Sequence, residues 1–582
     1  MNGKASKETI VVPARTASGG FKTSEGTLYV SKPFRSRQSN KLRALISFAP
    51  RQSHFDINNK SSGANEFRGF FTLFWTSIFI WTVRTYVGSI EANGQALNLG
   101  FATMFSQDAI TLALSDAVLV GSTFLCVPFA KAISRGWIRY YWTGVILQHT
   151  LQTLLLFIAV AWTFNRKWPW VQSGFLTLHT IVMIMKVHSY MTVNGQLQNA
   201  SQQSQILLEQ MQALTDKVGG WEKAILDAQH QRAEAEAVIE ATLSTSDDTS
   251  EPTPAGTPHI PHGSSATYLD VPTAVALRKR LAAVAMERST SSDTSNGGSS
   301  TPILIYKSTD DKKSPDVGPH PLIDHPDESI ANIAKEYSEL QSDLVSTGPE
   351  HVAWPNNISW KNFAVYQLIP SLVYELEYPR TDRIRPLYIF EKTVATFGTF
   401  ALLYTVTETF ILPFLPTPDQ SFFRSLLDLA LPFMISYLLL FYIIFECICN
   451  AFAELSYFAD RQFYEDWWNS TSWDEFSRKW NKPVHAFLLR HVYAPSILSY
   501  KMSKSSAMFA TFFLSACVHE LVMAVVTQKI RMYLFVLQLV QIPLILVSRI
   551  PIIKRNKLMG NVVFWLGLYA GFPLLCVAYV AY

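Results

Sequence analysis

One histidine, His519, lies inside the long apolar run SSAMFATFFLSACVHELVMAVV. A titratable side chain at membrane depth costs several kcal/mol unless it is satisfied, so this position predicts a functional site. A structural histidine bonded to a neighbouring helix is the alternative interpretation. Ser515 lies four residues earlier on the same helical face, but two neighbours on one helix do not establish an attacking serine and its base. Met523 stands where a His-Glu-x-x-His motif needs its second ligand, which argues against zinc.

A second concentration of reactive side chains is FYEDWWNSTSWDEFSRKWNKPVH, residues 463–485. It holds six aromatic residues before Trp480 and charges of both signs. Aromatic rings can stack on a purine, and basic residues can face phosphates. An amphipathic helix at the membrane surface fits the same composition, since Trp and Tyr favour the headgroup region. Spacing alone does not separate these two interpretations.

Polar and basic residues continue beyond this segment. Asn481 and His485 are four residues apart, with Pro483 between them. Donors and cations then follow at Arg490, Tyr493, Lys501 and Lys504. We expect this group at the cytosolic mouth of the helix that carries His519. For any single lysine, anchoring at the positive side of the membrane is the simpler explanation.

The elements that must position these residues are membrane helices. Charged residues make up 16% of the 582-residue chain, against roughly 25% in a typical soluble protein. Several apolar runs are long enough to cross a hydrocarbon core of about 30 Å. We therefore predict an all-α, polytopic membrane protein that encloses its site. About nine membrane helices are expected, at 69–87, 109–131, 142–162, 170–187, 387–413, 424–449, 505–527, 531–549 and 561–581.

Charge and composition divide the chain further. Residues 1–66 contain 11 Lys and Arg against 4 Asp and Glu, which favours a cytosolic N-terminus. Residues 244–320 are rich in Ser, Thr, Pro, Asp and Gly and are predicted to be disordered. The predicted parts are a basic, mostly disordered tail (1–66), the first membrane helices (67–195), a cytosolic linker of helical and disordered segments (196–350) and a catalytic membrane core (351–582).

Several segments resemble the fungal acyl-CoA:sterol O-acyltransferases of the membrane-bound O-acyltransferase family. FYEDWWN at 463–469 matches a family signature, and the sequences around His519 and Asn481 resemble its catalytic segments. The remaining matches are LHTIVMIMKVHSYMTVNG at 178–195, LVYELEYPRTDRIRP at 372–386 and GNVVFWLGLYAGFPLLCVAY at 560–579. The resemblance covers roughly residues 170–195 and 351–582. A departure is Arg385-Pro386-Leu387, where sterol enzymes often have Arg followed by Trp.

The resemblance implies acyl transfer from long-chain acyl-coenzyme A to a sterol 3β-hydroxyl, which forms steryl esters for storage. His519 would be the general base, Asn481 would stabilise the oxyanion, and His485 would orient the site. The implied acyl-CoA-binding residues are Phe463, Tyr464, Asp466, Trp467, Trp468, Asn469, Arg478, Trp480, Tyr493, Lys504 and Ser515. No metal or other cofactor is expected, because acyl-CoA is itself a co-substrate.

The implied partners are long-chain acyl-CoA, an ergosterol-like sterol and membrane lipids, without nucleic acid. A homodimer or higher homo-oligomer in the endoplasmic reticulum membrane is expected from the family. The signature is shared with acyl-CoA:diacylglycerol acyltransferases, so that activity is the main alternative. A transporter is a further alternative, with His519, Glu391 and Glu446 along its pathway, but no internal repeat is visible. A sterol-binding protein without enzymatic activity is the third.

Overall fold

A computed structural model describes the chain in segments: residues 21–23, 26–28, 48–53, 55–56, 68–96, 102–245, 320–346, 348, 350–417, 420–548, 550 and 556–581. The disorder predicted for 1–66 and 244–320 concerns residues that lie almost wholly outside these segments, so it stays a prediction.

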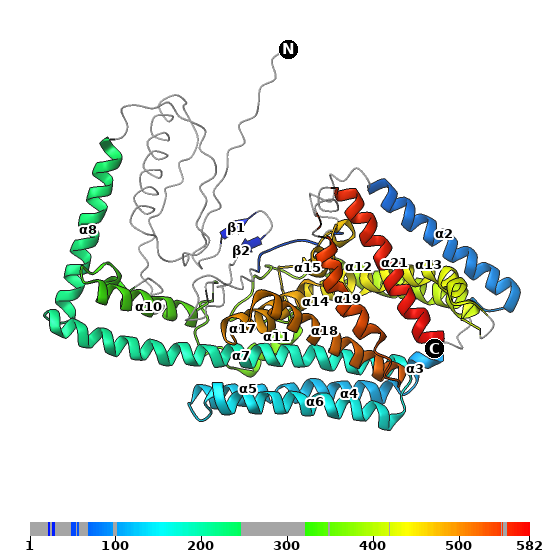
Figure 1. The fold of residues 1–582 in the computed structure, drawn as a ribbon, viewed down its shortest axis with the longest axis horizontal. Helices are drawn as coiled ribbons and strands as arrows, with labels where there is room; N and C mark the ends of the chain where they lie inside the picture. Colours follow the sequence, from blue (N-terminus) through cyan, green and yellow to red (C-terminus); the bar gives the residue numbers. More distant parts are fainter. Residues whose placement is uncertain are drawn as a thin grey trace, which may run out of the picture. The chain divides into compact units, whose positions relative to one another are not determined.

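The described elements are almost all helices, drawn in chain order in Figure 1. The first half contains the hairpin β1 (Phe21–Thr23) and β2 (Gly26–Leu28), then α2 (Arg68–Asn93), α3 (Ala102–Ser106), α4 (Ala109–Thr123), α5 (Cys126–Ser134), η1 (Tyr140–Gly144), α6 (Val145–Arg166), α7 (Trp170–Thr215), η2 (Asp216–Val218) and α8 (Trp221–Thr245). The second half contains η3 (Pro321–Asp324), α10 (Glu328–Leu344), α11 (Trp360–Leu368), α12 (Pro386–Val406), η4 (Thr407–Ile411), η5 (Leu412–Phe414), α13 (Phe422–Phe441), η6 (Tyr442–Ile448), α14 (Cys449–Leu455), η7 (Trp467–Asn469), α15 (Trp473–Trp480), α16 (Lys482–Leu488), η8 (Leu489–Tyr493), α17 (Ala494–Leu498), α18 (Lys504–Thr527), α19 (Tyr533–Ser548) and α21 (Lys557–Ala581).

The predicted all-α membrane fold is confirmed. Within the described segments, seven helical stretches are long and apolar enough to cross a membrane. They are Ala109–Ser134, Tyr140–Arg166, Trp170–Val218, Pro386–Phe414, Phe422–Leu455, Lys504–Thr527 and Lys557–Tyr579. The other two predicted spans are helices as well, but α2 is not among these stretches and α19 is a shorter apolar helix. The expected count of nine was therefore approximate.

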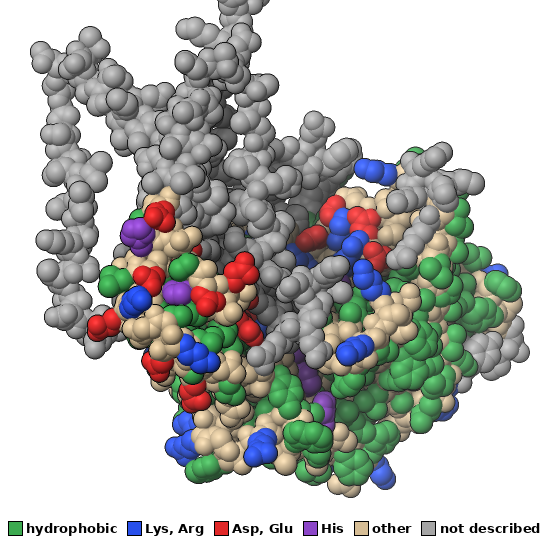
Figure 2. Space-filling model, turned by 60° about the vertical axis from the view of Figure 1, so that its left-hand side comes forward, with side chains coloured by type: hydrophobic (Ala, Val, Ile, Leu, Met, Phe, Trp, Pro, Cys, Tyr) green, Lys and Arg blue, Asp and Glu red, His purple; other side chains and the backbone are tan. Residues whose placement is uncertain are grey.

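Apolar side chains cover much of the outside of these helices. Leu114, Val118, Phe157, Phe397 and Leu427 all lie on spans and are each more than 60% exposed. Figure 2 shows broad hydrophobic areas on the face that it presents. Since such areas are rare on a soluble monomer, they are consistent with helices that contact lipid.

The contacts divide the chain into two compact units. Unit 1 comprises residues 1–195 and 347–582, and unit 2 comprises residues 196–346. The boundary falls within α7, which at 46 residues is the longest described helix. Unit 2 has a small apolar core of its own, formed by Met211, Ala224, Ala228, Leu322, Ile330 and Ala334. In it α10 begins directly after Asp327, whose side chain accepts the Ser329 N–H at 2.8 Å and caps the helix.

Several charged residues in or beside the spans of unit 1 form buried ion pairs. Lys392 of α12 donates to Glu446 of η6 at 2.8 Å, and both side chains are buried. Ser53, from the segment before α2, also donates to Glu446. Nearby, Arg385 and Arg461 form ion pairs with the buried Glu454. Burying a charge is costly unless it is paired, and these pairs therefore hold α12, η6 and α14 together. Neither Lys392 nor Glu446 lines the cavity described next.

Candidate active site

A large cavity of about 1830 Å³ lies within unit 1. It follows the whole of α18, because the first and last residues of that helix, Lys504 and Thr527, both line it. A helix of this length spans about 36 Å at 1.5 Å per residue, comparable to the thickness of a bilayer core. The predicted site residues that line the cavity are Arg478, Trp480, Asn481, His485, Tyr493, Lys504, Ser515 and His519. Residues more than 40 positions apart in the sequence therefore meet in one space.

α18 presents His519 to this cavity. The helix begins after Ser503, whose hydroxyl accepts the Ser506 N–H at 3.1 Å and so satisfies one of the free donors of the first turn. One turn before His519, the Ser515 backbone oxygen lies 2.7 Å from Nδ1 of the imidazole. Because a carbonyl oxygen only accepts, Nδ1 must carry the proton. In the neutral ring, Nε2 therefore keeps its lone pair, and no described residue occupies it.

The Ser515 hydroxyl lies 3.4 Å from Nδ1 of His519, not from Nε2. Since Nδ1 already carries a proton that it donates to a carbonyl, this nitrogen is not available to take a proton from the serine. The geometry thus does not support Ser515 as a nucleophile activated by His519. Ser515 remains a polar group on the cavity lining.

Asn481 lies at the junction between two short helices. α15 begins at Ser472, whose hydroxyl accepts the Glu475 N–H at 3.2 Å, and it ends at Trp480. Asn481 then starts α16, because its side-chain oxygen accepts the Val484 N–H at 3.2 Å. This N-cap uses the oxygen of the side-chain amide, so the NH₂ group of the amide can donate to another acceptor. Among the described residues, that NH₂ group has no hydrogen-bond partner, and Asn481 lines the cavity.

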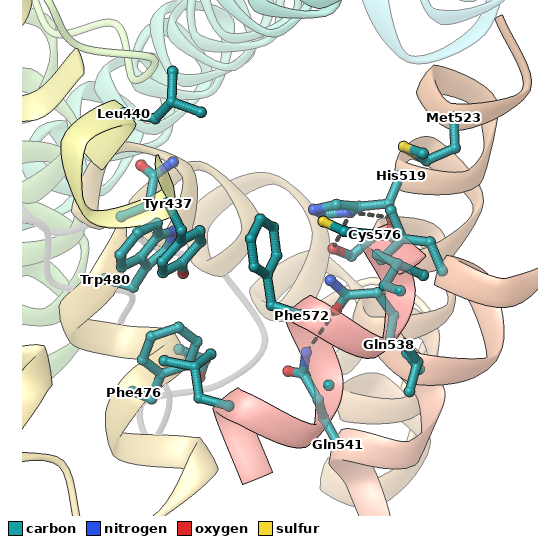
Figure 3. Close-up of a pocket in the computed structure, with 18 of the residues that line it drawn as sticks. Tyr437, Leu440, Phe476, Trp480, His519, Met523, Gln538, Gln541, Phe572 and Cys576 are labelled. Atoms are coloured by element: carbon teal, nitrogen blue, oxygen red, sulfur yellow. Dashed lines mark hydrogen bonds between the residues drawn. The ribbon is translucent and has the colours of Figure 1, made fainter. Parts of the chain in front are cut away.

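Trp480 forms an aromatic wall opposite α18. Its ring stacks on Tyr437 with 4.7 Å between centroids and an angle of 3°. It also contacts Phe441 at 4.7 Å and Phe476 at 5.6 Å. Figure 3 shows Tyr437 and Trp480 on one side of the pocket, with His519 on the other and Phe572 between them. In this part of the cavity, aromatic rings thus face the imidazole of His519.

Cationic side chains lie near the start of α18. Lys504 is its first residue, and Arg478 is an exposed residue of the last turn of α15, paired with Asp474 at 3.1 Å. His485 also lines the cavity, and burial together with the positive charge of Arg478 lowers its pKa. A lowered pKa favours the neutral imidazole at physiological pH. The cavity lining thus includes the cations Arg478 and Lys504 together with a histidine whose lowered pKa favours its neutral form.

The signature segment, residues 463–469, is placed differently. The segment does not contribute its predicted acyl-CoA-binding residues to the cavity lining, namely Phe463, Tyr464, Asp466, Trp467, Trp468 and Asn469. Phe463, Tyr464 and Trp467 are at most 3% exposed. The Tyr464 hydroxyl donates to Glu446 at 2.9 Å, and Trp467 packs edge to face on Trp480 at 4.8 Å. This placement does not test the expected contact of these residues with acyl-CoA, but the burial of Phe463, Tyr464 and Trp467 favours a role in holding neighbouring residues instead.

The signature segment instead contacts the chain around Asn481. The Glu465 N–H donates to the Lys479 carbonyl at 2.9 Å, and the Lys482 N–H donates to the Phe463 carbonyl at 3.0 Å. Two ion pairs run in parallel, Asp466 with Lys479 at 2.9 Å and Glu465 with Lys482 at 2.8 Å. These contacts with residues 463–466 fix Lys479 and Lys482, which flank Asn481 in the chain.

Sequence reasoning missed the contribution of α19. Glu520, the buried neighbour of His519, accepts the Met532 N–H at 2.7 Å and the Phe535 N–H at 3.1 Å. Its carboxylate therefore caps the start of α19 and fixes that helix against α18. α19 carries Gln538 and Gln541, which both line the cavity. Like His519, these two amides are polar side chains within an apolar run, so the sequence alone could have indicated them.

Within the residues that the structure describes, no group of three or more His, Cys, Asp or Glu side chains is arranged to hold a metal ion.

Comparison with known proteins identifies the family of this chain. The model of the membrane-bound O-acyltransferase family matches residues 133–581. Probable sterol O-acyltransferase 1 from Schizosaccharomyces pombe is 32% identical over 92% of this chain and 86% of its own length. Probable sterol O-acyltransferase 2 from the same organism is 29% identical over 94% of this chain and 93% of its own length. Diacylglycerol O-acyltransferase 1 from Dictyostelium discoideum is 33% identical, but over only 39% of this chain and 37% of its own length.

Proposed function

Because this chain belongs to the membrane-bound O-acyltransferase family, we propose that it transfers a long-chain acyl group from acyl-coenzyme A to the 3β-hydroxyl of a sterol. Relatives named as sterol O-acyltransferases match more than nine tenths of the chain. The observation that carries the mechanism is the imidazole of His519, which faces the cavity with its Nε2 lone pair unoccupied by any described residue.

In the proposed reaction, Nε2 of His519 takes the proton of the sterol hydroxyl as the oxygen attacks the thioester carbonyl carbon. A positioned base of this kind contributes about 10²–10⁴-fold to the rate. The carbonyl oxygen becomes an oxyanion, and the Asn481 amide N–H donates to it. When the C–S bond breaks, the coenzyme A sulfur leaves and takes the proton from His519. The products are the steryl ester and free coenzyme A.

The cavity suits the two substrates. Coenzyme A is polyanionic, and Arg478 and Lys504 provide cations at one end of the cavity. Tyr493 and Trp480 lie on the same lining and offer aromatic and hydroxyl contacts. The acyl chain and the sterol body are apolar, as are most of the residues along α18 and α19. His485, with its lowered pKa, is proposed to orient the reacting groups as a neutral imidazole.

The setting of the reaction is part of the proposal. The protein is a multi-pass membrane protein, and we place it in the endoplasmic reticulum, with the basic residues 1–66 on the cytosolic side. Acyl-CoA then arrives from the cytosol, and the apolar ester leaves laterally into the bilayer. A homodimer or higher homo-oligomer is proposed by analogy with the family. No cofactor beyond acyl-CoA as co-substrate is invoked.

A diacylglycerol acceptor is the second candidate, favoured only by the relative of that name, which matches little more than a third of the chain. The test uses purified protein in lipid nanodiscs with labelled oleoyl-CoA, and offers ergosterol, cholesterol and diacylglycerol separately. We expect steryl ester to form at a rate well above that of triacylglycerol. Faster triacylglycerol formation would overturn the sterol assignment, and ester formation with neither acceptor would overturn acyl transfer. The His519→Ala protein serves as the inactive control.

A further inference from the structure

Two glutamines in α19, Gln538 and Gln541, are polar groups that the mechanism above does not use. They are three residues apart and thus on one face of the helix, amid the apolar sequence YLFVLQLVQIPLILVS. Both line the cavity, and Figure 3 shows them bonded to each other on the side of the pocket that carries His519. Polar groups at membrane depth are costly unless they are satisfied, so their presence calls for a partner.

The pair satisfies only a part of its own hydrogen-bonding capacity. The Gln541 amide nitrogen donates to the Gln538 side-chain oxygen at 3.0 Å. No other described residue bonds to either side chain. Each amide has two N–H donors and one oxygen with two lone pairs, so the pair retains both donors and acceptors whichever amide donates to the other. It therefore suits a ligand group that both accepts and donates.

The glutamines lie at the depth of His519. α18 and α19 pack against each other and are joined by residues 528–532. His519 comes eight residues before the end of α18, and Gln541 comes eight residues after the start of α19. At 1.5 Å per residue, both lie about 12 Å from this connection. Glu520 fixes the register, because its carboxylate holds the N–H groups of Met532 and Phe535.

We propose that Gln538 and Gln541 form the subsite for the acceptor's hydroxyl group. The hydroxyl oxygen accepts a hydrogen bond from a glutamine N–H, while the hydroxyl hydrogen is directed to Nε2 of His519. A sterol fits this subsite because it carries one hydroxyl on an apolar body. The thioester carbonyl only accepts, and the free NH₂ group of Asn481 is available to it on the other side of the cavity. The inference rests on the proposed function and adds the residues that select the acceptor.

The test measures binding rather than turnover, in the His519→Ala background, so that no probe is consumed. Gln541→Leu and Gln538→Leu are compared with Leu546→Met, a volume-conserving change at an exposed α19 residue that does not line the cavity. The probes are cholesterol, its 3-deoxy analogue cholest-5-ene, and oleoyl-CoA. Gln541→Met and Gln538→Met repeat the test with an unbranched side chain if either leucine variant unfolds.

We expect each glutamine variant to weaken cholesterol binding by about tenfold, as for the loss of one well-placed hydrogen bond. Cholest-5-ene and oleoyl-CoA binding should change by less than twofold, and Leu546→Met should change none of the three. Equal weakening of cholesterol and cholest-5-ene, unchanged cholesterol binding, or weakened oleoyl-CoA binding would each overturn the subsite. If wild-type protein still makes steryl ester, the proposed function survives that failure; if it makes none, both fall.

Discussion

Two neighbouring regions of unit 1 differ in how their polar side chains are satisfied. In the signature segment, residues 463–469, polar groups such as the Tyr464 hydroxyl and the Asp466 carboxylate bind other protein side chains. On the cavity wall, by contrast, Nε2 of His519 and the NH₂ group of Asn481 have no partner among the described residues. In the first region the hydroxyl and carboxylate groups are satisfied from within the protein, although the buried Trp467 indole N–H has no partner among the described residues. The second region offers its hydrogen bonds to a ligand.

We infer from this difference that the two regions have different roles. Saturated groups stabilise a conformation, and here the conformation is that of residues 479–482, which carry Asn481. Unsatisfied groups that face a cavity are the ones that can stabilise a transition state. We therefore expect changes on the cavity wall to lower the rate in a folded protein. Changes in the signature segment should lower stability first.

The largest effect is expected for His519→Ala. Loss of the general base should lower transfer by roughly 10³-fold, within the range for such catalysis. The melting temperature should be unchanged, because the imidazole bonds to no described residue outside its own helix. The measurement is the initial rate with saturating oleoyl-CoA and sterol. Met523→Leu, one turn further along the same cavity lining, is the matched control. A rate within tenfold of wild type would remove His519 from the mechanism.

Asn481 allows its two roles to be separated. Asn481→Ser keeps an N-cap for α16 but removes the amide donor, and Asn481→Ala removes both. Both should lose about 10²-fold in kcat, as for one oxyanion-stabilising donor. Only the alanine variant should also lose about 1 kcal/mol of stability, the usual value of an N-cap. Near-normal turnover in Asn481→Ser would show that the residue acts as a cap alone.

A change in the signature segment should behave in the opposite way. Tyr464→Phe leaves the buried Glu446 without one of its donors and should destabilise the protein by about 1–3 kcal/mol. The rate per folded molecule should fall less than threefold. Thermal unfolding and activity are measured on the same preparation, with the exposed Tyr500→Phe as control. A large loss of turnover or of coenzyme A binding at unchanged stability would place the signature segment in the binding site.

The smallest effect concerns the ion pair of Asp466 with Lys479. Burial works to raise the pKa of Asp466, but the hydrogen bond and charge of Lys479 outweigh it and hold the pKa below its ordinary value. The ion pair thus stabilises the fold above the ordinary pKa, and this contribution is lost as the pH falls through the lowered value. Asp466→Asn should cost at most about 1 kcal/mol at pH 7, since the pair is partly exposed. In unfolding experiments, its difference from wild type should shrink on acidification; a growing difference contradicts the assignment.

The sequence predicted the helices better than it predicted the contacts. Apolar runs determine where helices cross a bilayer, and a lone His519 within such a run is informative without knowledge of its neighbours. Contacts between distant residues leave no such local signal: Ser53 meets Glu446 across 393 positions. The aromatic residues of 463–480 suggested stacking on a purine, but rings that pack edge to face on one another, as Trp467 does on Trp480, have the same composition. Gln538 and Gln541, by contrast, are polar residues in an apolar run, and this local pattern could have indicated them from the sequence.

The most direct test of the account is an experimental structure with both substrates in place. It requires a thioether analogue of oleoyl-CoA, which is not cleaved, together with a 3β-hydroxysterol. We expect the sterol oxygen within about 3 Å of Nε2 of His519, the distance that proton transfer needs. The coenzyme A chain should run from Arg478 and Lys504 to Asn481, without touching the signature segment. A ligand that contacts the side chains of residues 463–469, or a sterol hydroxyl distant from His519, would contradict the account.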